Sequence, residues 1–563
     1  MKRILYLVLA FLGASALVLA IFPHKKQKVE FTFSHKSGFY DEPFYVTITA
    51  PTNEIYYTLD GSEPSKESLR YENSIFIDDA SKNENVYSMR TDVSTGFFEE
   101  KIKMPALYKI PDYKIDKCTV LRAVYYNISG EPSEIKTASY FVSFDKKTGY
   151  DGMRIASLVT APENLFDYEH GIYVTGKIFD DYFSNDNYFA DEALNKADKE
   201  FWRPYWWFWN ANYRQRGNIW ERNATVQFFD SNKSRLLEQN CGIRIQGGGS
   251  RGNNPKSLAL HARKRYGKKY FEHDFFDTGK NPQSLILFTG GDDSNTKMRD
   301  YLMARLTKKL NFATFTYKPV VLFLNGEYWG LYLLSEKYNE FFCRNKYGVY
   351  GKDVIMIKSG QLEVGTIKDI YYYNEMVDFI STADFSDPEN YRKASELIDM
   401  QSFIDYFAAE IYISRNNDWP KSNFALWRTR TINGSSSYAD KKWRWMLFDV
   451  NSGGMDASLV DFDSIESTKQ NSAIFANLCT NAEFRQNFVA TMNNLMQTVF
   501  TIENVNEHIN FITAEMATAM KTHNRRFFGT EAEEKYINGV ENIRTFFAER
   551  PSYMKILLEK HFS

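Results

Sequence analysis

The 563-residue chain has little cysteine and no excess of charge of either sign. It contains four widely separated cysteines and no CxxC pair, so we expect neither a structural zinc site nor a disulfide-stapled scaffold. One or two disulfides, or none, remain open. The 69 basic and 71 acidic residues leave a net charge of -2, which argues against a nucleic-acid partner because no bulk positive field gathers phosphates.

The chain also lacks long hydrophobic runs, with one exception at the N-terminus. Lys2 and Arg3 precede an apolar run from Ile4 to Phe22, and basic residues follow it. Its length of about 19 residues lies between that of a signal peptide and a spanning helix. Residues 1–29 are therefore predicted to be an export signal that is cleaved or retained as a membrane anchor, rather than a buried cytosolic helix. The rest of the chain is then expected at the cell surface, in a periplasm or secreted.

Aromatic residues, by contrast, make up 16% of the sequence. The chain is too long to fold as a single domain around one hydrophobic core. Short β-branched runs separated by turn residues fill residues 31–143, which predicts an all-β sandwich, while about 80–115 is interpreted as a polar insertion. The stretch Tyr57-Thr58-Leu59-Asp60-Gly61-Ser62-Glu63-Pro64 and the later Gly130-Glu131-Pro132-Ser133 resemble the sandwich domain at the C-terminus of chitobiases and hexosaminidases. By that resemblance the sandwich is an accessory domain.

From residue 150 the pattern is mixed α and β, and it is helical from about 470. Residues 296–312 and 400–413 have apolar residues at helical spacing. Two apolar runs flank Asn325-Gly326, which predicts a β-hairpin. Residues 443–450 are predicted to form a strand. The expected fold is a sandwich followed by an α+β domain over 150–563 with a helical C-terminal part.

Three polar residues suggest phosphoryl transfer. Asp418 and Asn423 have the Asp-x-x-x-x-Asn spacing of a kinase catalytic loop, in which the Asp accepts the substrate hydroxyl proton and the Asn holds a metal ion. Asp449 ends an apolar strand, where a carboxylate can bind Mg²⁺ that bridges ATP phosphates. Each piece alone also fits a chance spacing or a helix cap.

A glycine-rich turn and a strand-end glutamate complete the candidate nucleotide site. Gly247-Gly248-Gly249-Ser250 follows a strand, and the flanking cations Arg244, Arg251 and Lys256 form a phosphate cradle in this interpretation. The turn matches neither the Walker pattern nor GxGxxG, and a hairpin turn with surface charges explains it about equally well. Glu336 is the candidate carboxylate that holds a phosphate-binding lysine, although an exposed strand-end charge explains it too.

Taken together, the motifs resemble the CotH kinase family, named for a spore-coat protein. They include Gly171-Ile172-Tyr173-Val174, Trp220-Glu221-Arg222, Gly242-Ile243-Arg244-Ile245, Met298-Arg299-Asp300, Asn325-Gly326-Glu327-Tyr328-Trp329-Gly330, Asn417-Asp418-Trp419 and Trp443-Arg444-Trp445 through Asp449. The resemblance implies a reduced protein-kinase fold that uses ATP and Mg²⁺ (or Mn²⁺) to phosphorylate a protein substrate. Asp418 would be the catalytic acid, Asn423 and Asp449 metal ligands, and Lys256 and Glu336 parts of the nucleotide site.

This chain departs from the family at residue 451. The family often has Asp-x-Asp here, whereas this chain has Asp449-Val450-Asn451. Asn451 is expected to bind the metal through its carbonyl oxygen, without contributing charge. The alternative hypothesis is a non-catalytic surface, matrix or carbohydrate-binding protein, favoured by Asn451, the sandwich and the aromatic run 201–209. A polysaccharide partner belongs to that alternative, although we expect the run itself to pack into the core. A glycoside hydrolase ranks last because no carboxylate pair stands out.

Overall fold

The structure is a computed structural model that describes residues 29–185, 189–190, 192 and 204–563. The predicted export signal or anchor lies outside the described residues except for Val29. Within the described ranges, no helix is both long and apolar enough to cross a membrane. The four cysteines are buried and unpaired, so the chain has no disulfide.

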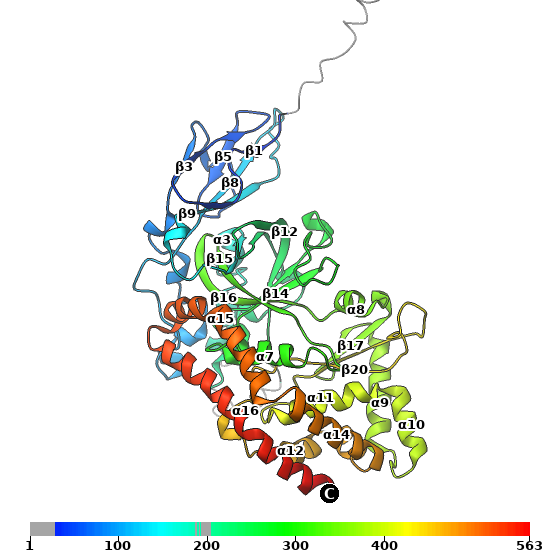
Figure 1. The fold of residues 1–563 in the computed structure, drawn as a ribbon. Coiled ribbons are helices and arrows are strands. Elements are labelled where there is room, and N and C mark those ends of the chain that lie inside the picture. The colour runs from blue at the N-terminus through cyan, green and yellow to red at the C-terminus, as the bar shows by residue number, and fades with distance from the viewer. Residues whose placement is uncertain (1–28, 186–188, 191, 193–203) are drawn as a thin grey trace, which may run out of the picture.

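The N-terminal part is a β-sandwich, drawn at the top of Figure 1. Its largest sheet has the strand order β2-β9-β8-β5-β6, and β1–β4 and β3–β7 form two smaller pairs. The core contains Val46, Ile55, Ile77, Leu121 and Tyr140. The strands are β1 (Thr32–Phe33), β2 (Gly38–Tyr40), β3 (Phe44–Val46), β4 (Ile48–Thr49), β5 (Ile55–Thr58), β6 (Leu69–Arg70), β7 (Ile75–Ile77), β8 (Thr119–Tyr125) and β9 (Lys136–Val142).

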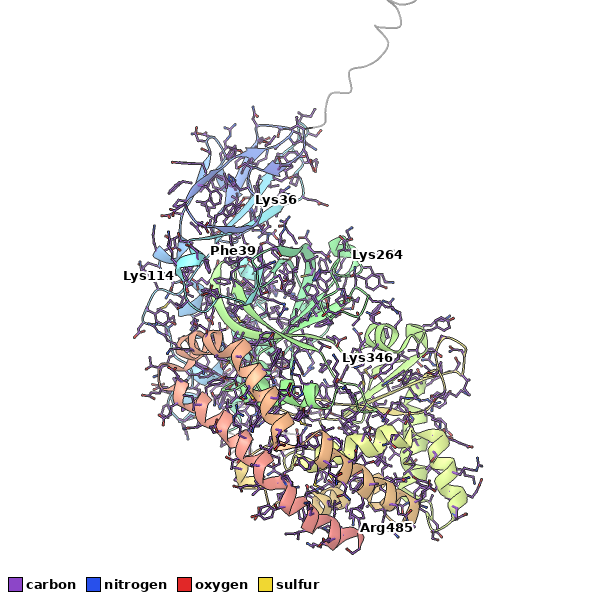
Figure 2. All side chains as sticks on the ribbon, viewed as in Figure 1. Lys36, Phe39, Lys114, Lys264, Lys346 and Arg485 are labelled. Carbon is purple, nitrogen blue, oxygen red and sulfur yellow. The ribbon has the colours of Figure 1, made fainter. Side chains whose placement is uncertain are left out.

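Residues 80–117, which we call the strap, leave the sandwich after β7 and return to it at β8. The strap contains three short 3₁₀ turns and α2 (Glu99–Ile102). It was interpreted from sequence as a polar insertion, but Val93, Ile102 and Tyr108 are buried in a hydrophobic cluster shared with the next domain. Lys114 lies on this strap beside the barrel, whereas Phe39 lies at the junction of sandwich and barrel (Figure 2).

A closed seven-stranded barrel follows, with the order β10-β11-β12-β13-β14-β16-β15. β10 pairs in parallel with β15, and the other neighbours are antiparallel. The glycine-rich turn (residues 247–252) connects β12 to β13. The strands are β10 (Arg154–Val159), β11 (Arg222–Phe229), β12 (Arg235–Ile245), β13 (Leu258–His261), β14 (Ser284–Phe288), β15 (Tyr317–Leu324) and β16 (Glu327–Glu336).

The second half consists of a four-stranded sheet, β18-β17-β19-β20, and a group of helices. The sheet lies beside the barrel, and α15 and α16 run along the barrel and the helical part (Figure 1). The strands are β17 (Val354–Lys358), β18 (Gln361–Val364), β19 (Ala425–Thr429) and β20 (Arg444–Met446). The helices are α3 (Pro162–Phe166), α4 (Gly176–Ser184), α7 (Arg299–Leu306), α8 (Glu340–Tyr347), α9 (Ile370–Thr382), α10 (Pro388–Leu397), α11 (Met400–Tyr412), α12 (Ser464–Asn471), α13 (Ala473–Leu478), α14 (Ala482–Thr498), α15 (Ile502–Phe528) and α16 (Ala532–Phe562).

The fold class agrees with the prediction, a β-rich N-terminal part followed by a mixed α/β part with a helical end. The hairpin around Asn325-Gly326 is confirmed as β15 and β16, and both turn residues have positive φ. The helix expected over 400–413 is α11. Two elements are shorter than expected: the helix over 296–312 spans only Arg299–Leu306, and the strand over 443–450 spans Arg444–Met446.

Candidate active site

A large cavity of about 1180 Å³ lies between the barrel and the second sheet. Seven of the eight predicted site residues line it, namely Arg244, Arg251, Glu336, Asp418, Asn423, Asp449 and Asn451. They come from five places in the chain: the end of β12, the glycine-rich turn, the end of β16, the loop after α11 and the turn after β20. These five places are far apart in the sequence, and the fold brings them to one cavity.

The loop after α11 brings Asp418 and Asn423 into direct contact. The Asn423 Nδ2 donates a hydrogen bond to Asp418 Oδ2 at 2.6 Å, and Asn423 has a left-handed φ of 52° that turns the chain back into β19. Its backbone N–H donates to the Ser359 Oγ at 3.1 Å, which ties the loop to β17. Asp418 is therefore fixed by its partner five residues later, with 36% of its side chain exposed to the cavity.

Behind Asp418 lies a buried ion pair. Arg415 has a side chain with no exposed surface; its Nη2 lies 3.4 Å from Asp418 Oδ1 and its Nη1 lies 3.3 Å from Glu410 Oε2. Glu410 is equally buried, and burial raises the pKa of this carboxyl to about 7 although Arg415 opposes the shift. The guanidinium thus holds one face of Asp418 while the other face meets Asn423.

Asp449 follows β20 in a left-handed conformation, with a φ of 60°. The Asn451 Nδ2 donates to Asp449 Oδ1 at 2.6 Å and to Asp300 Oδ2 at 2.8 Å. The Asn451 Oδ1 accepts the Asp292 backbone N–H at 3.0 Å. The predicted role of Asn451 as a metal ligand is therefore not supported, because its amide bridges two carboxylates and its oxygen is already an acceptor.

The wall around these residues is acidic. Asp292, Asp300, Asp418 and Asp449 all line the cavity, and within the described part of the chain only Asp418 has a basic side chain at ion-pair distance. Burial, followed by the charge of Asp449, raises the pKa of Asp300 to about 7. Burial and the same charge raise the pKa of Asp292. An uncompensated cluster of carboxylates is the arrangement that a cation stabilises.

Cations line the same cavity, namely Arg216, Arg244, Arg251, Lys337 and Lys358. Arg251 donates only to backbone carbonyls, those of Ile245, Gly247, Tyr213 and Gln215. Burial and the neighbouring arginines lower its pKa to about 9. Arg251 therefore supports the glycine-rich turn from within, and the phosphate cradle stays a prediction.

Lys256 is the one predicted site residue that the structure places elsewhere. Its side chain is completely buried beneath the glycine-rich turn, and its Nζ donates to the carbonyls of Arg251 and Asn253 at 2.6 and 2.9 Å. The ammonium also lies 3.8 Å from the centre of the Tyr213 ring. Lys256 supports the turn from inside rather than facing the cavity, so a direct contact with a nucleotide there is not supported.

Glu336 lines the cavity but does not hold a lysine. Its Oε2 accepts the Thr316 backbone N–H at 3.1 Å, and it forms no ion pair with any residue in the described ranges. Burial raises its pKa to about 7. The prediction that Glu336 positions a phosphate-binding lysine is therefore not supported by its contacts.

Comparison with known families decides the affiliation. Residues 243–554, just over half of the chain, match the family described as CotH kinase protein. The chain belongs to the CotH kinase family. Residues 35–93 match the chitobiase/beta-hexosaminidase C-terminal domain, in the order that the sequence motifs indicated. A search of curated proteins gave no match for this CotH kinase family member.

The CotH kinase family implies ATP and a divalent metal, and the residues present fit such an ion. Asp449 and Asp292 offer carboxylate oxygens, and Asn423 donates through its nitrogen, while its amide oxygen makes no hydrogen bond with the described residues. Carboxylate and amide oxygens suit Mg²⁺, which keeps several waters and takes few protein ligands. Among the described residues, no group of three or more His, Cys, Asp or Glu lies at metal-binding distance.

Several cavity residues of this CotH kinase family member were missed by sequence reasoning. Lys358 and Asp292 carried no motif in their own neighbourhood. Lys337 follows the candidate Glu336 but had no assigned role, and neither did Asp300, which belonged to a family run. The aromatic run 201–209 lies partly outside the described residues. In its described part, Trp206 and Trp209 are buried as expected, while Trp207 lines the cavity and packs against Gly249 and Gly252 of the glycine-rich turn.

Proposed function

We infer that this protein is an exported or surface-anchored protein kinase that transfers the γ-phosphoryl group of ATP to hydroxyl groups of a protein substrate. The observation that carries the proposal is that one cavity is lined both by cations and by carboxylates. Exposed cations such as Arg216 suit the phosphates of ATP, and carboxylates such as Asp449 suit the metal that accompanies them. Membership of the CotH kinase family supports the same reaction.

In the proposed step the oxygen of the acceptor hydroxyl forms a bond to the γ-phosphorus as the bond from that phosphorus to the β–γ bridging oxygen breaks. The hydroxyl proton passes to the Asp418 carboxylate, and ADP leaves with the bonding electron pair. Asp418 is oriented for this by Asn423 and Arg415. Asp449, Asn423 and Asp292 would hold Mg²⁺ or Mn²⁺, which would supply positive charge against the phosphates.

The test is incubation of the whole protein with γ-labelled ATP, Mg²⁺ or Mn²⁺ and a general acceptor such as casein. We expect labelling of the protein itself or of the acceptor. Asp418→Asn should reduce labelling by about 10² to 10⁴-fold while nucleotide binding is retained, and Asp449→Asn should weaken the response to metal. Labelling that persists in Asp418→Asn, or a protein that binds no ATP, would refute the proposal.

A second function, binding of polysaccharide by the sandwich, is favoured by one surface feature. Tyr45 of β3 and Phe76 of β7 face solvent, 60% and 53% exposed, with their rings 5.1 Å apart. Paired exposed rings suit stacking on sugars. Retention on chitin or cellulose that is lost in Tyr45→Ala/Phe76→Ala would support this role, and equal elution of both proteins would exclude this pair.

A further inference from the structure

Among the described residues, Lys337 and Lys358 line the cavity with no side-chain hydrogen bond or ion pair, and Lys358 is the one whose strand is tied to the loop that carries Asp418 and Asn423. Lys358 is the last residue of β17, and it pairs in register with Ala425 of β19. The next residue, Ser359, accepts the Asn423 N–H and donates its own N–H to the Phe424 carbonyl at 2.9 Å. The position of Lys358 is thereby fixed relative to the end of the catalytic loop.

The Lys358 side chain lines the cavity without a protein partner. Its ammonium makes no hydrogen bond and no ion pair with any residue in the described ranges. The Lys358 Nζ lies 4.1 Å from the centre of the Phe448 ring. An aromatic face attracts a cation but does not neutralise it. A half-buried, charged lysine without a carboxylate partner destabilises the folded protein unless an anion binds to it.

The charges around Lys358 show which anion fits. Burial lowers its pKa, with Glu363 and Asp449 opposing the shift and Arg216 and Arg251 adding to it. Lys358, Asp449 and the glycine-rich turn line the same cavity. The Lys358 ammonium lies over the Phe448 ring, and Asp449 directly follows Phe448 in the chain. A phosphate that meets a metal on Asp449 would come within reach of this ammonium.

We propose that Lys358 binds the terminal phosphate of the nucleotide, whereas the sequence analysis expected Lys256 to be the lysine that contacts the nucleotide. The proposal rests on the proposed kinase function and adds to it a binding residue from the second sheet. Lys256 faces away from the cavity and donates to carbonyls, so it cannot reach the phosphate without breaking the turn. Lys358 reaches the cavity from beside Asn423, where the transferred group must lie.

The experiment compares the binding of a non-hydrolysable ATP analogue, AMP-PNP, and of ADP, each with Mg²⁺, to the whole protein. Lys358→Met should lower the affinity for AMP-PNP by about tenfold or more, because a charge-assisted contact is lost. It should change the affinity for ADP much less, because ADP lacks the terminal phosphate. Lys358→Arg keeps the cation and should retain most of the AMP-PNP affinity.

The matched control is Lys352→Met, which removes an exposed lysine just before the start of the same strand and should leave both affinities unchanged. Melting curves verify that each variant is folded. Equal affinities of Lys358→Met and the unaltered protein for AMP-PNP, or equal losses for AMP-PNP and ADP, would overturn this inference and leave the kinase proposal standing. An unaltered protein that binds neither nucleotide would overturn both.

Discussion

Asn451 is the residue at which this chain departs from the usual CotH pattern, and its contacts explain how the departure is tolerated. Its amide donates to both Asp449 and Asp300, which keeps two carboxylates together without a cation. An aspartate at this position would replace those donors with a third carboxylate. The substitution that restores the family pattern should therefore make the site more dependent on metal.

Asn451→Asp should lower the melting temperature in the absence of divalent ions, because it removes two hydrogen bonds and adds like-charge repulsion worth roughly 1–3 kcal/mol. Added Mg²⁺ should then raise the melting temperature of Asn451→Asp more than that of the unaltered protein. Asn83→Asp, at an exposed position, is the control. An identical Mg²⁺ response of the two proteins would contradict the bridging role of Asn451.

Glu410 gives a prediction about pH. Its pKa in the folded protein is about 7, above its usual value of 4.5, so the folded state holds a proton that the unfolded chain releases between those values. The free energy of unfolding should therefore decrease as pH rises from about 4.5 to about 7. Glu410→Gln should melt at a similar temperature to the unaltered protein at pH 5 and at a higher temperature at pH 8. A lower melting temperature at pH 8 would show that the ionised carboxylate stabilises Arg415 more than its burial costs.

At the residue scale, the sequence predicted contacts within one loop, but not contacts that depend on tertiary packing. Asp418 and Asn423 are five residues apart in one loop, so their contact follows from the sequence. The sequence analysis placed Lys256 at the cavity. Successive residues of an extended chain point to opposite faces, and it is Ser257 that lines the cavity. The bridge from Asn451 to Asp300 joins residues 151 positions apart, which no local pattern reveals.

Among the elements, the turn after β20 shows why the predicted strand ends early. Residues 447–450 leave the sheet so that Asp449, with positive φ, reaches the cavity. Gly454 follows with a φ of 79°, and a Cβ there would lie 2.4 Å from the Ile413 carbonyl oxygen. The hairpin around Asn325-Gly326 was predictable because its turn residues are adjacent, whereas this turn depends on packing against the end of α11.

Gly454→Ala should therefore destabilise the protein by roughly 1–3 kcal/mol, since the alanine is strained by both its φ and its backbone contact. The displaced turn should also weaken the response to Mg²⁺ through Asp449. Calorimetry and metal titration measure the two effects. Gly434→Ala is the control, because no atom lies within 4 Å of its added Cβ, and a Gly454→Ala protein that matches it would refute the packing argument.

At the scale of the whole molecule, the strap joins the sandwich to the barrel, although sequence alone assigned it to a polar insertion. The Glu327 carboxylate at the start of β16 accepts the backbone N–H groups of Val86 and Ser88 at 2.6 and 2.7 Å. The Arg526 Nη2 of α15 donates to the Ser88 carbonyl at 3.1 Å. The apolar residues of the strap follow neither a helical nor a strand period, so the local pattern did not show which of them are buried against the neighbouring domain.

Val93 tests whether the strap stabilises the barrel. It is 2% exposed and packs in the cluster that includes barrel strands, so Val93→Asp buries an unpaired charge and should cost about 3–5 kcal/mol. Leu69→Asp, at a position in the sandwich that is 60% exposed, should cost little. Amide hydrogen exchange should become faster in β15 and β16 of Val93→Asp. If exchange became faster only in the sandwich strands, the strap would be an insertion of the sandwich alone, and the barrel would not depend on it.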